Sequence, residues 1–334
     1  MASRTTVFPR QGKRDILDPR FKVFSMTKSR TFVFFLHSFA LGAVLFAQER
    51  VSITPRSRPA PVIVRPLANL RLDVEMVQIP VSVTDVLGHP LIQLTKGDFR
   101  LFEDDVELPI KAFSVVDAPI SAVLVFDSSR SMKPRIAEAR AAVEQFLKTS
   151  MPGDEFALVR FSDKAEVTAP FTQDVGEISR QLSFVEPHGW TALYDAACLA
   201  AHQMKKASNN RRVLVIFSDG ADNNSRYSES ELIAILRESD VRVYAASIFE
   251  KPRSLEHIAE DSGGRALWVK KLDDLPAAVE TLSRQIRSEY MLGYTPASAQ
   301  NDGKYHRVRV EVQPPSGMSR VVASWKHGYT APGE

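Results

Sequence analysis

The sequence predicts an α/β fold in which a doubly wound, mostly parallel sheet is inserted into a smaller β-sandwich-like domain. From residue 119 to residue 289, continuous apolar runs alternate with amphipathic, helix-like segments. That alternation is typical of a parallel sheet with helices on both faces. Segments on either side of this region alternate apolar and polar residues, as half-buried strands do. Each flanking segment is too small to bury a core alone, so we expect the two to pair.

The N-terminal β segment, residues 69–118, shows strand periodicity from its start. Leu72, Val74 and Met76 alternate with charged residues. The strands expected in this segment are 72–76, 81–84, 98–103 and 110–116, with turns at 85–88 and 104–105. The C-terminal β segment, residues 290–334, returns to the same periodicity. Its expected strands are 290–294, 306–312 and 320–325.

The central region, residues 119–289, alternates strands with helices. The expected strands are 123–126, 156–161, 166–171, 213–217, 242–248 and 266–269. The expected helices, with apolar residues three and four positions apart, are 133–148, 175–184, 192–206, 228–238, 255–261 and 275–288. Ser228 and Glu231 form a capping-box pattern at one helix start. Gly263 and Gly264 are a stop signal for the helix before them.

Polar residues follow two of the expected strands directly. The apolar run 123–126 ends in Asp127, Ser129 and Ser131, and the run 213–217 is followed by Asp219. A loop between them carries Thr191 at the start of a helix. The carboxyl ends of parallel strands share one edge of a sheet, where ligands bind. Carboxylate and hydroxyl oxygens suit Mg²⁺ or Mn²⁺. An Asp-Ser-Ser segment is also an ordinary turn and helix cap, so both interpretations stay open.

These segments, in this order, resemble the von Willebrand factor A domain, a Rossmann-like fold, over roughly residues 119–290. The family carries an Asp-x-Ser-x-Ser motif, a distant Thr and a distant Asp. The resemblance implies a metal-ion-dependent adhesion site that binds Mg²⁺ (or Mn²⁺) and accepts an acidic side chain from a protein partner. It implies no catalytic residue. The metal ligands that it implies are Asp127, Ser129, Ser131, Thr191 and Asp219.

Two residues of these motifs depart from the family. Arg130 stands where a small residue is common, and Trp190 replaces a glycine before Thr191. Neither supplies a metal ligand, and both would flank the metal. With His188 they are candidate ligand contacts, although a lone loop histidine is more often simply solvated. Val-Thr-Asp-x-x-Gly, Asp-Phe-x-x-x-Glu-Asp and a closing His-Gly-Tyr also resemble an A-domain-related family of acidobacterial type, which supports the architecture more than an activity.

The N-terminal region has the features of an export signal. Residues 31–47 are uncharged and mostly apolar, and Lys28 and Arg30 precede them. We expect a signal peptide, residues 1–47, with cleavage near Ala47. An uncleaved signal anchor is the alternative, and Met26 would give a more compact signal as the true start. A Pro/Arg-rich linker, residues 48–68, follows. The predicted location is the periplasm, the cell envelope or the extracellular space.

Charge and motif content exclude several classes of protein. Residues 1–30 hold eight basic and two acidic residues, and the rest of the chain holds 35 basic and 38 acidic ones. The folded region therefore carries no excess of positive charge for nucleic acid. The nucleophile-elbow, phosphate-loop and zinc-protease motifs do not occur in the sequence. The sequence predicts a non-enzymatic, metal-dependent protein-binding or adhesion module. A structural envelope protein with an inert A domain and a Mg²⁺-dependent hydrolase are the alternatives.

Overall fold

The computed structural model describes residues 76–219, 222–248, 253–296, 302–314, 317 and 320–331. All of them lie in the second of the two units into which the chain divides, residues 1–68 and 69–334. The predicted signal peptide (1–47) and linker (48–68) fall outside the described residues. Across the described ranges, no helix is both long enough and apolar enough to cross a membrane.

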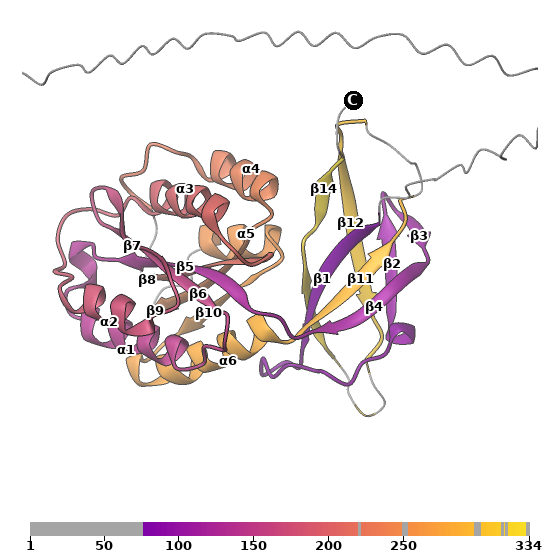
Figure 1. Cartoon of the computed structure of the whole chain (residues 1–334), viewed down its shortest axis with the longest axis horizontal. Helices are drawn as coiled ribbons and strands as arrows, with labels where there is room; N and C mark the ends of the chain where they lie inside the picture. Colours follow the sequence, from indigo (N-terminus) through magenta and orange to yellow (C-terminus); the bar gives the residue numbers. More distant parts are fainter. Residues whose placement is uncertain are drawn as a thin grey trace, which may run out of the picture. The chain divides into compact units, whose positions relative to one another are not determined.

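A six-stranded sheet forms the centre of the α/β region (Figure 1). Its strand order is β10-β9-β8-β5-β6-β7. All neighbours are parallel except the edge strand β7, which runs antiparallel to β6. This confirms the predicted doubly wound, mostly parallel sheet. The strands are β5 (Ile120–Asp127), β6 (Glu155–Phe161), β7 (Ala165–Thr172), β8 (Arg211–Ser218), β9 (Arg242–Ile248) and β10 (Arg265–Val269).

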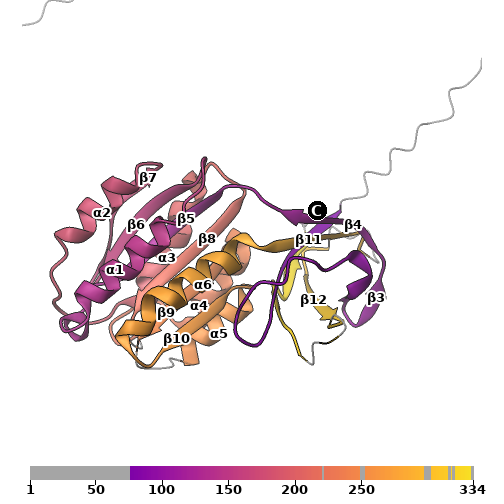
Figure 2. The same cartoon turned by 90° about the horizontal axis from the view of Figure 1, so that it is seen from below.

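Helices cover both faces of this sheet (Figures 1 and 2). One face packs against α1 (Ile136–Leu147), α2 (Val175–Ser183) and α6 (Leu275–Arg287). The other packs against α3 (Leu193–Gln203), α4 (Glu229–Ser239) and α5 (Arg253–Asp261). Successive side chains of a strand point to opposite faces. In β5, Leu124 and Phe126 therefore join the first core, and Val123 and Val125 join the second.

The flanking β segments combine into two four-stranded sheets, ordered β13-β1-β11-β4 and β14-β12-β2-β3. Each sheet contains strands from before and after the α/β region, and one apolar core joins the two sheets. The predicted pairing of the two segments is confirmed, whereas the exact limits of the inserted region, 119–289, stay a prediction. These strands are β1 (Val77–Thr84), β2 (Phe99–Glu103), β3 (Val106–Leu108), β4 (Ile110–Val116), β11 (Glu289–Tyr294), β12 (Tyr305–Val312), β13 (Val322–Trp325) and β14 (Gly328–Thr330).

The start of the first long helix differs from the prediction of residue 133. α1 begins at Ile136, after a 3₁₀ turn at Arg130–Met132. Met132 is fully buried. The backbone before Ile136 makes successive tight turns, in which Met132 and Arg135 donate N–H groups to the residue three before. This turn carries the motif at the end of β5.

Candidate metal centre

Asp127 and Asp219 lie at the same edge of the central sheet. β5 ends at Asp127, and β8 ends at Ser218, one residue before Asp219. The two strands are parallel neighbours, with Phe126 opposite Phe217. The polar residues that follow them therefore emerge together at the carboxyl edge, as the sequence predicted. Both aspartates are buried.

A continuous chain of side-chain oxygens runs from the first motif to the last. The Oγ atoms of Ser129 and Ser131 lie 3.0 Å apart. The Ser131 hydroxyl donates to Oδ1 of Asp219, also at 3.0 Å. Mg²⁺ binds oxygen at about 2.0–2.1 Å in an octahedron, whose neighbouring ligands are then about 2.9 Å apart. The same spacing thus serves a hydrogen bond in the metal-free chain and an edge of an octahedron around Mg²⁺. This donor set fits the ion.

Hydroxyl groups are needed at this site because carboxylates alone do not fill it. In the part of the chain that the structure describes, no three His, Cys, Asp or Glu side chains gather as a metal cluster. The candidate site offers two carboxylates, and its other oxygens belong to serine and threonine. A small number of negative ligands leaves a bound cation able to attract a further carboxylate from outside.

The Asp127 carboxylate is fixed by the chain from both sides. Its Oδ1 accepts the backbone N–H of Ser129 at 2.8 Å, and its Oδ2 accepts the Ser218 hydroxyl at 2.6 Å. Burial raises the pKa of Asp127 to about 6, although these hydrogen bonds oppose the shift. With both oxygens engaged inside the protein, Asp127 is suited to contribute negative charge and to orient Ser129.

Asp219 already has a cationic partner in this structure. Nη1 of Arg135 forms an ion pair with Oδ2 of Asp219, and the Ser131 hydroxyl donates a hydrogen bond to Oδ1. The Asp219 side chain is only 3 % exposed, so this carboxylate is shielded from water. Arg135 stands at the N-cap of α1, four residues after Ser131.

Thr191 is held in place by the loop that follows Asp219. Its backbone N–H donates to Oδ1 of Asn223 at 2.9 Å, and its carbonyl accepts N–H groups of Asn223 and Asn224. Oδ1 of Asp222 accepts the backbone N–H groups of Leu193, at 2.8 Å, and Tyr194, and so caps the start of α3. Side chains of the loop after Asp219 therefore position the Thr191 segment by accepting hydrogen bonds from its backbone.

The three candidate ligand contacts lie on exposed parts of the loops around this site. Trp190 is 65 % exposed, and its backbone N–H donates to Oδ1 of Asp163 at 2.8 Å. Arg130 is exposed, and its N–H donates to the carbonyl of Gly189. The ring of His188 lies within hydrogen-bond distance of Ser162 and of a backbone carbonyl. Their role in ligand contact stays a prediction.

Several residues of the site carried little signal in the sequence. Ser218 precedes Asp219 directly, and its contact with Asp127 depends on the register of two strands far apart in the chain. Asn223 and Asp222 act through non-local hydrogen bonds to the Thr191 loop. The pairing of Arg135 with Asp219 joins residues 84 positions apart, so no local pattern encodes it either.

Gly189 is the residue of this loop that we expect to tolerate substitution least. Its φ is +69°, and an added Cβ would lie 2.2 Å from Oδ2 of Asp163. Gly189→Ala should therefore destabilise the protein by about 2 kcal/mol or more and displace the loop. Urea unfolding measures the loss. Gly317→Ala is the control, because that glycine also has positive φ but open space around it. Equal losses in the two variants would refute the role of the Asp163 contact.

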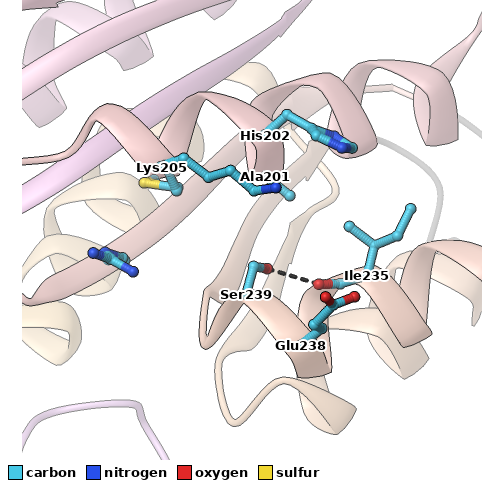
Figure 3. Close-up of a pocket in the computed structure, with 8 residues that line it drawn as sticks. Ala201, His202, Lys205, Ile235, Glu238 and Ser239 are labelled. Atoms are coloured by element: carbon cyan, nitrogen blue, oxygen red, sulfur yellow. Dashed lines mark hydrogen bonds between the residues drawn. The ribbon is translucent and has the colours of Figure 1, made fainter.

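Two cavities border α3. One of about 660 Å³ is lined by Asp163, Asp195 and Asn224, among others, and adjoins the Thr191 loop. The other, of about 260 Å³, lies between the last turn of α3 and α4, at the opposite end of α3 from Thr191 (Figure 3). Figure 3 also shows the Ser239 hydroxyl donating to the carbonyl of Ile235, at 2.7 Å. Of these two cavities, the first is the nearer to the Thr191 loop, because Asn224 in its lining donates a backbone N–H to the carbonyl of Thr191.

A family model described as the von Willebrand factor type A domain matches residues 122–221, which include all five candidate metal ligands. No curated protein matches the sequence. The chain is similar to the solved von Willebrand factor type A protein of Catenulispora acidiphila, with 14% identity over 69% of this chain and 75% of that one, and a TM-score of 0.47.

Two further solved structures are similar over about half of this chain. Proximal thread matrix protein 1 of the mussel byssus, described with a zinc-occupied MIDAS motif, shares 19% identity over 55% of this chain and 49% of that one (TM-score 0.47). The von Willebrand factor domain of the type V pili tip protein Mfa5 from Porphyromonas gingivalis shares 13% identity over 51% of this chain and 96% of that one (TM-score 0.41). The family match over residues 122–221 and the order of the central sheet show that this chain contains a von Willebrand factor type A domain.

Proposed function

We propose that this chain is a non-enzymatic, metal-dependent protein-binding module of the cell envelope or the secreted space. The observation that carries the proposal is the oxygen chain from Ser129 through Ser131 to Asp219, with 3.0 Å steps, at the carboxyl edge of the sheet. Ser129, Ser131, Thr191 and Asp219 would hold Mg²⁺ or Mn²⁺, and Asp127 would add charge. When bound, the metal supplies a positive centre that attracts a carboxylate of a protein partner.

The surroundings of the site favour an acidic ligand. Arg130 is exposed on the turn between Ser129 and Ser131, and Lys133 is exposed at the end of the same turn. Arg226, 91 % exposed in its side chain, lines the adjoining cavity. Arg226 is already paired with Asp195 at 3.3 Å, so Arg130 and Lys133 are the exposed cations that raise the local concentration of negatively charged partners. Trp190 would offer an apolar surface beside the carboxylate contact.

A second function is favoured by one observation, the ion pair between Arg135 and Asp219. An internal cation at this carboxylate is compatible with a structural envelope protein whose A domain binds no metal. The predicted export signal would serve either function. Metal binding distinguishes the two.

The test is calorimetric titration of the full chain with Mg²⁺ and with Mn²⁺. We expect the unsubstituted chain to bind, and Ser131→Ala to lower the affinity at least about tenfold. Ser128→Ala is the matched control, because that hydroxyl donates to the carbonyl of Phe161, at 2.7 Å, rather than facing Asp219. Its affinity should stay within about threefold of the unsubstituted chain. A folded chain that binds neither metal would contradict the proposal and support the structural alternative.

A further inference from the structure

The pairing of Arg135 with Asp219 has a consequence for any cation that binds at this site. Asp219 has two carboxylate oxygens, and the chain itself engages both. Oδ2 is paired with Nη1 of Arg135, and Oδ1 accepts the Ser131 hydroxyl at 3.0 Å. Both oxygens of Asp219 therefore have partners within the chain, and one positive charge lies against this carboxylate.

The position of Arg135 is set by the backbone and not only by its side chain. Its N–H donates to the carbonyl of Met132 at 2.8 Å, and its own carbonyl accepts the N–H of Ala139 at 2.9 Å. Arg135 thus joins the turn of the first motif to the first turn of α1. Its side chain is 26 % exposed, compared with 3 % for Asp219.

Electrostatics make the guanidinium and a divalent cation competitors. If both bound to Asp219, the single positive charge of the guanidinium and the double positive charge of the cation would lie within the width of one carboxylate group. Burial of that carboxylate limits screening by water and salt, so the repulsion stays substantial. The attraction between Asp219 and Arg135 must also be given up, at least in part, for the cation to use this oxygen.

We propose that Arg135 is an internal competitor that lowers the affinity of this site for divalent cations. This inference rests on the proposed function, because it assumes that the site binds a metal. Arg135 then sets the metal concentration at which the site fills, without being a ligand. Below that concentration the site would hold no cation, and Arg135 would neutralise the charge of Asp219.

The test compares three variants of the full chain by Mn²⁺ titration calorimetry. Arg135→Gln removes the charge, and we expect it to bind Mn²⁺ at least about tenfold more tightly than the unsubstituted chain. Arg135→Lys keeps the charge and should bind close to the unsubstituted chain. Lys133→Gln removes an exposed charge two residues away and should change the affinity by less than about threefold.

Thermal unfolding supplies a second readout. Without metal, Arg135→Gln should unfold at a lower temperature than the unsubstituted chain, because Asp219 loses its partner. Addition of saturating Mn²⁺ should raise the melting temperature of Arg135→Gln by more than it raises that of the unsubstituted chain. If the ion pair were purely structural, Arg135→Gln would instead lower the melting temperature equally with and without Mn²⁺ and would leave the Mn²⁺ affinity unchanged.

The outcomes separate this inference from the proposed function. If the unsubstituted chain binds Mn²⁺ and Arg135→Gln binds equally or more weakly, the competitor role is wrong and the metal site stands. If only Arg135→Gln binds, the competitor role is supported and is strong enough to keep the unsubstituted site closed. If neither binds, both proposals fail.

Discussion

Replacing Glu289 with glutamine should destabilise the folded protein by about 3–5 kcal/mol, because it would leave two buried arginines without a counter-ion. Glu289, at the first position of β11, is 1 % exposed. Its Oε2 lies 3.0 Å from Nη2 of Arg211 and 2.9 Å from Nη2 of Arg242, and its Oε1 is paired with Nη1 of Arg242. The loss is to be measured by urea unfolding of the full chain.

The geometry of this cluster explains the size of the expected effect. Arg211 begins β8 and Arg242 begins β9, so both lie at the amino edge of the central sheet, opposite to the candidate metal centre. Burial lowers the pKa of both guanidinium groups, which reflects the cost of removing their charge from water. Arg211 also donates to the carbonyls of Ala118 and Ile286, both at 2.6 Å. The cluster thus holds the chain where it enters and leaves the α/β region.

An exposed ion pair provides the control for this prediction. Arg100 and Glu107 pair on the β2–β3 hairpin with side chains 45% and 50% exposed. Glu107→Gln should cost far less than Glu289→Gln, because water already solvates both charges. If Glu289→Gln costs no more than Glu107→Gln, the three residues do not form a buried charge cluster in solution.

The sequence predicted where the residues of the site lie better than it predicted the hydrogen bonds between them. Apolar runs ending in polar residues predicted that Asp127 and Asp219 would follow strands at one edge of the sheet, and the structure shows that these strands, β5 and β8, are neighbours. Periodicity is a local property, and it locates strand ends well. By contrast, the hydrogen bond from Ser218 to Asp127 joins residues 91 positions apart, and no local pattern encodes it.

Short strands were the main omission in the predicted fold. β3 and β14 each have three residues, too few to establish an alternating pattern. Their pairing with β2 and β12 comes from the register of longer neighbours. The turn at Asp104 and Asp105 was predicted, and both residues adopt positive φ, as a tight hairpin between β2 and β3 requires.

The charge on Asp127 gives the second large prediction: without metal, Asp127→Asn should be more stable than the unsubstituted chain at pH 7.5. Burial raises the pKa of this carboxyl from 3.8 to about 6, so ionisation costs the folded state free energy. A difference of about two units between the folded and unfolded pKa values corresponds to about 3 kcal/mol. The amide can still accept the N–H of Ser129 and can donate to the Ser218 hydroxyl. Urea unfolding in EDTA measures the gain.

The pH dependence has a definite sign. Between pH 3.8 and about 6 the folded state binds more protons at Asp127 than the unfolded state does, so the unsubstituted chain loses stability as pH rises through this window. The advantage of Asp127→Asn should therefore be complete above about pH 6 and should vanish toward pH 4. A constant difference across this range would show that Asp127 is not the titrating group.

Asp154 supplies the matched control, because it is a buried aspartate with a cationic partner. Its Oδ2 lies 2.8 Å from Nη2 of Arg287, and its Oδ1 accepts the N–H of Ile120 at 2.9 Å. Asp154→Asn should therefore destabilise the protein, the opposite sign to Asp127→Asn. Two buried aspartates with opposite responses would separate the effect of an unpaired charge from that of any substitution in the core.

A stabilising substitution at Asp127 has a functional meaning if the site binds metal. A cation at 100 times its dissociation constant adds about 2.7 kcal/mol to the unsubstituted chain, which is close to the cost of the buried carboxylate. Asp127→Asn, with lower negative charge at the site, should gain little from Mg²⁺ or Mn²⁺. The two proteins should therefore differ in EDTA and converge at saturating metal. Convergence would indicate that the buried charge is retained for metal binding, whereas a difference that persists in metal would indicate an inert site.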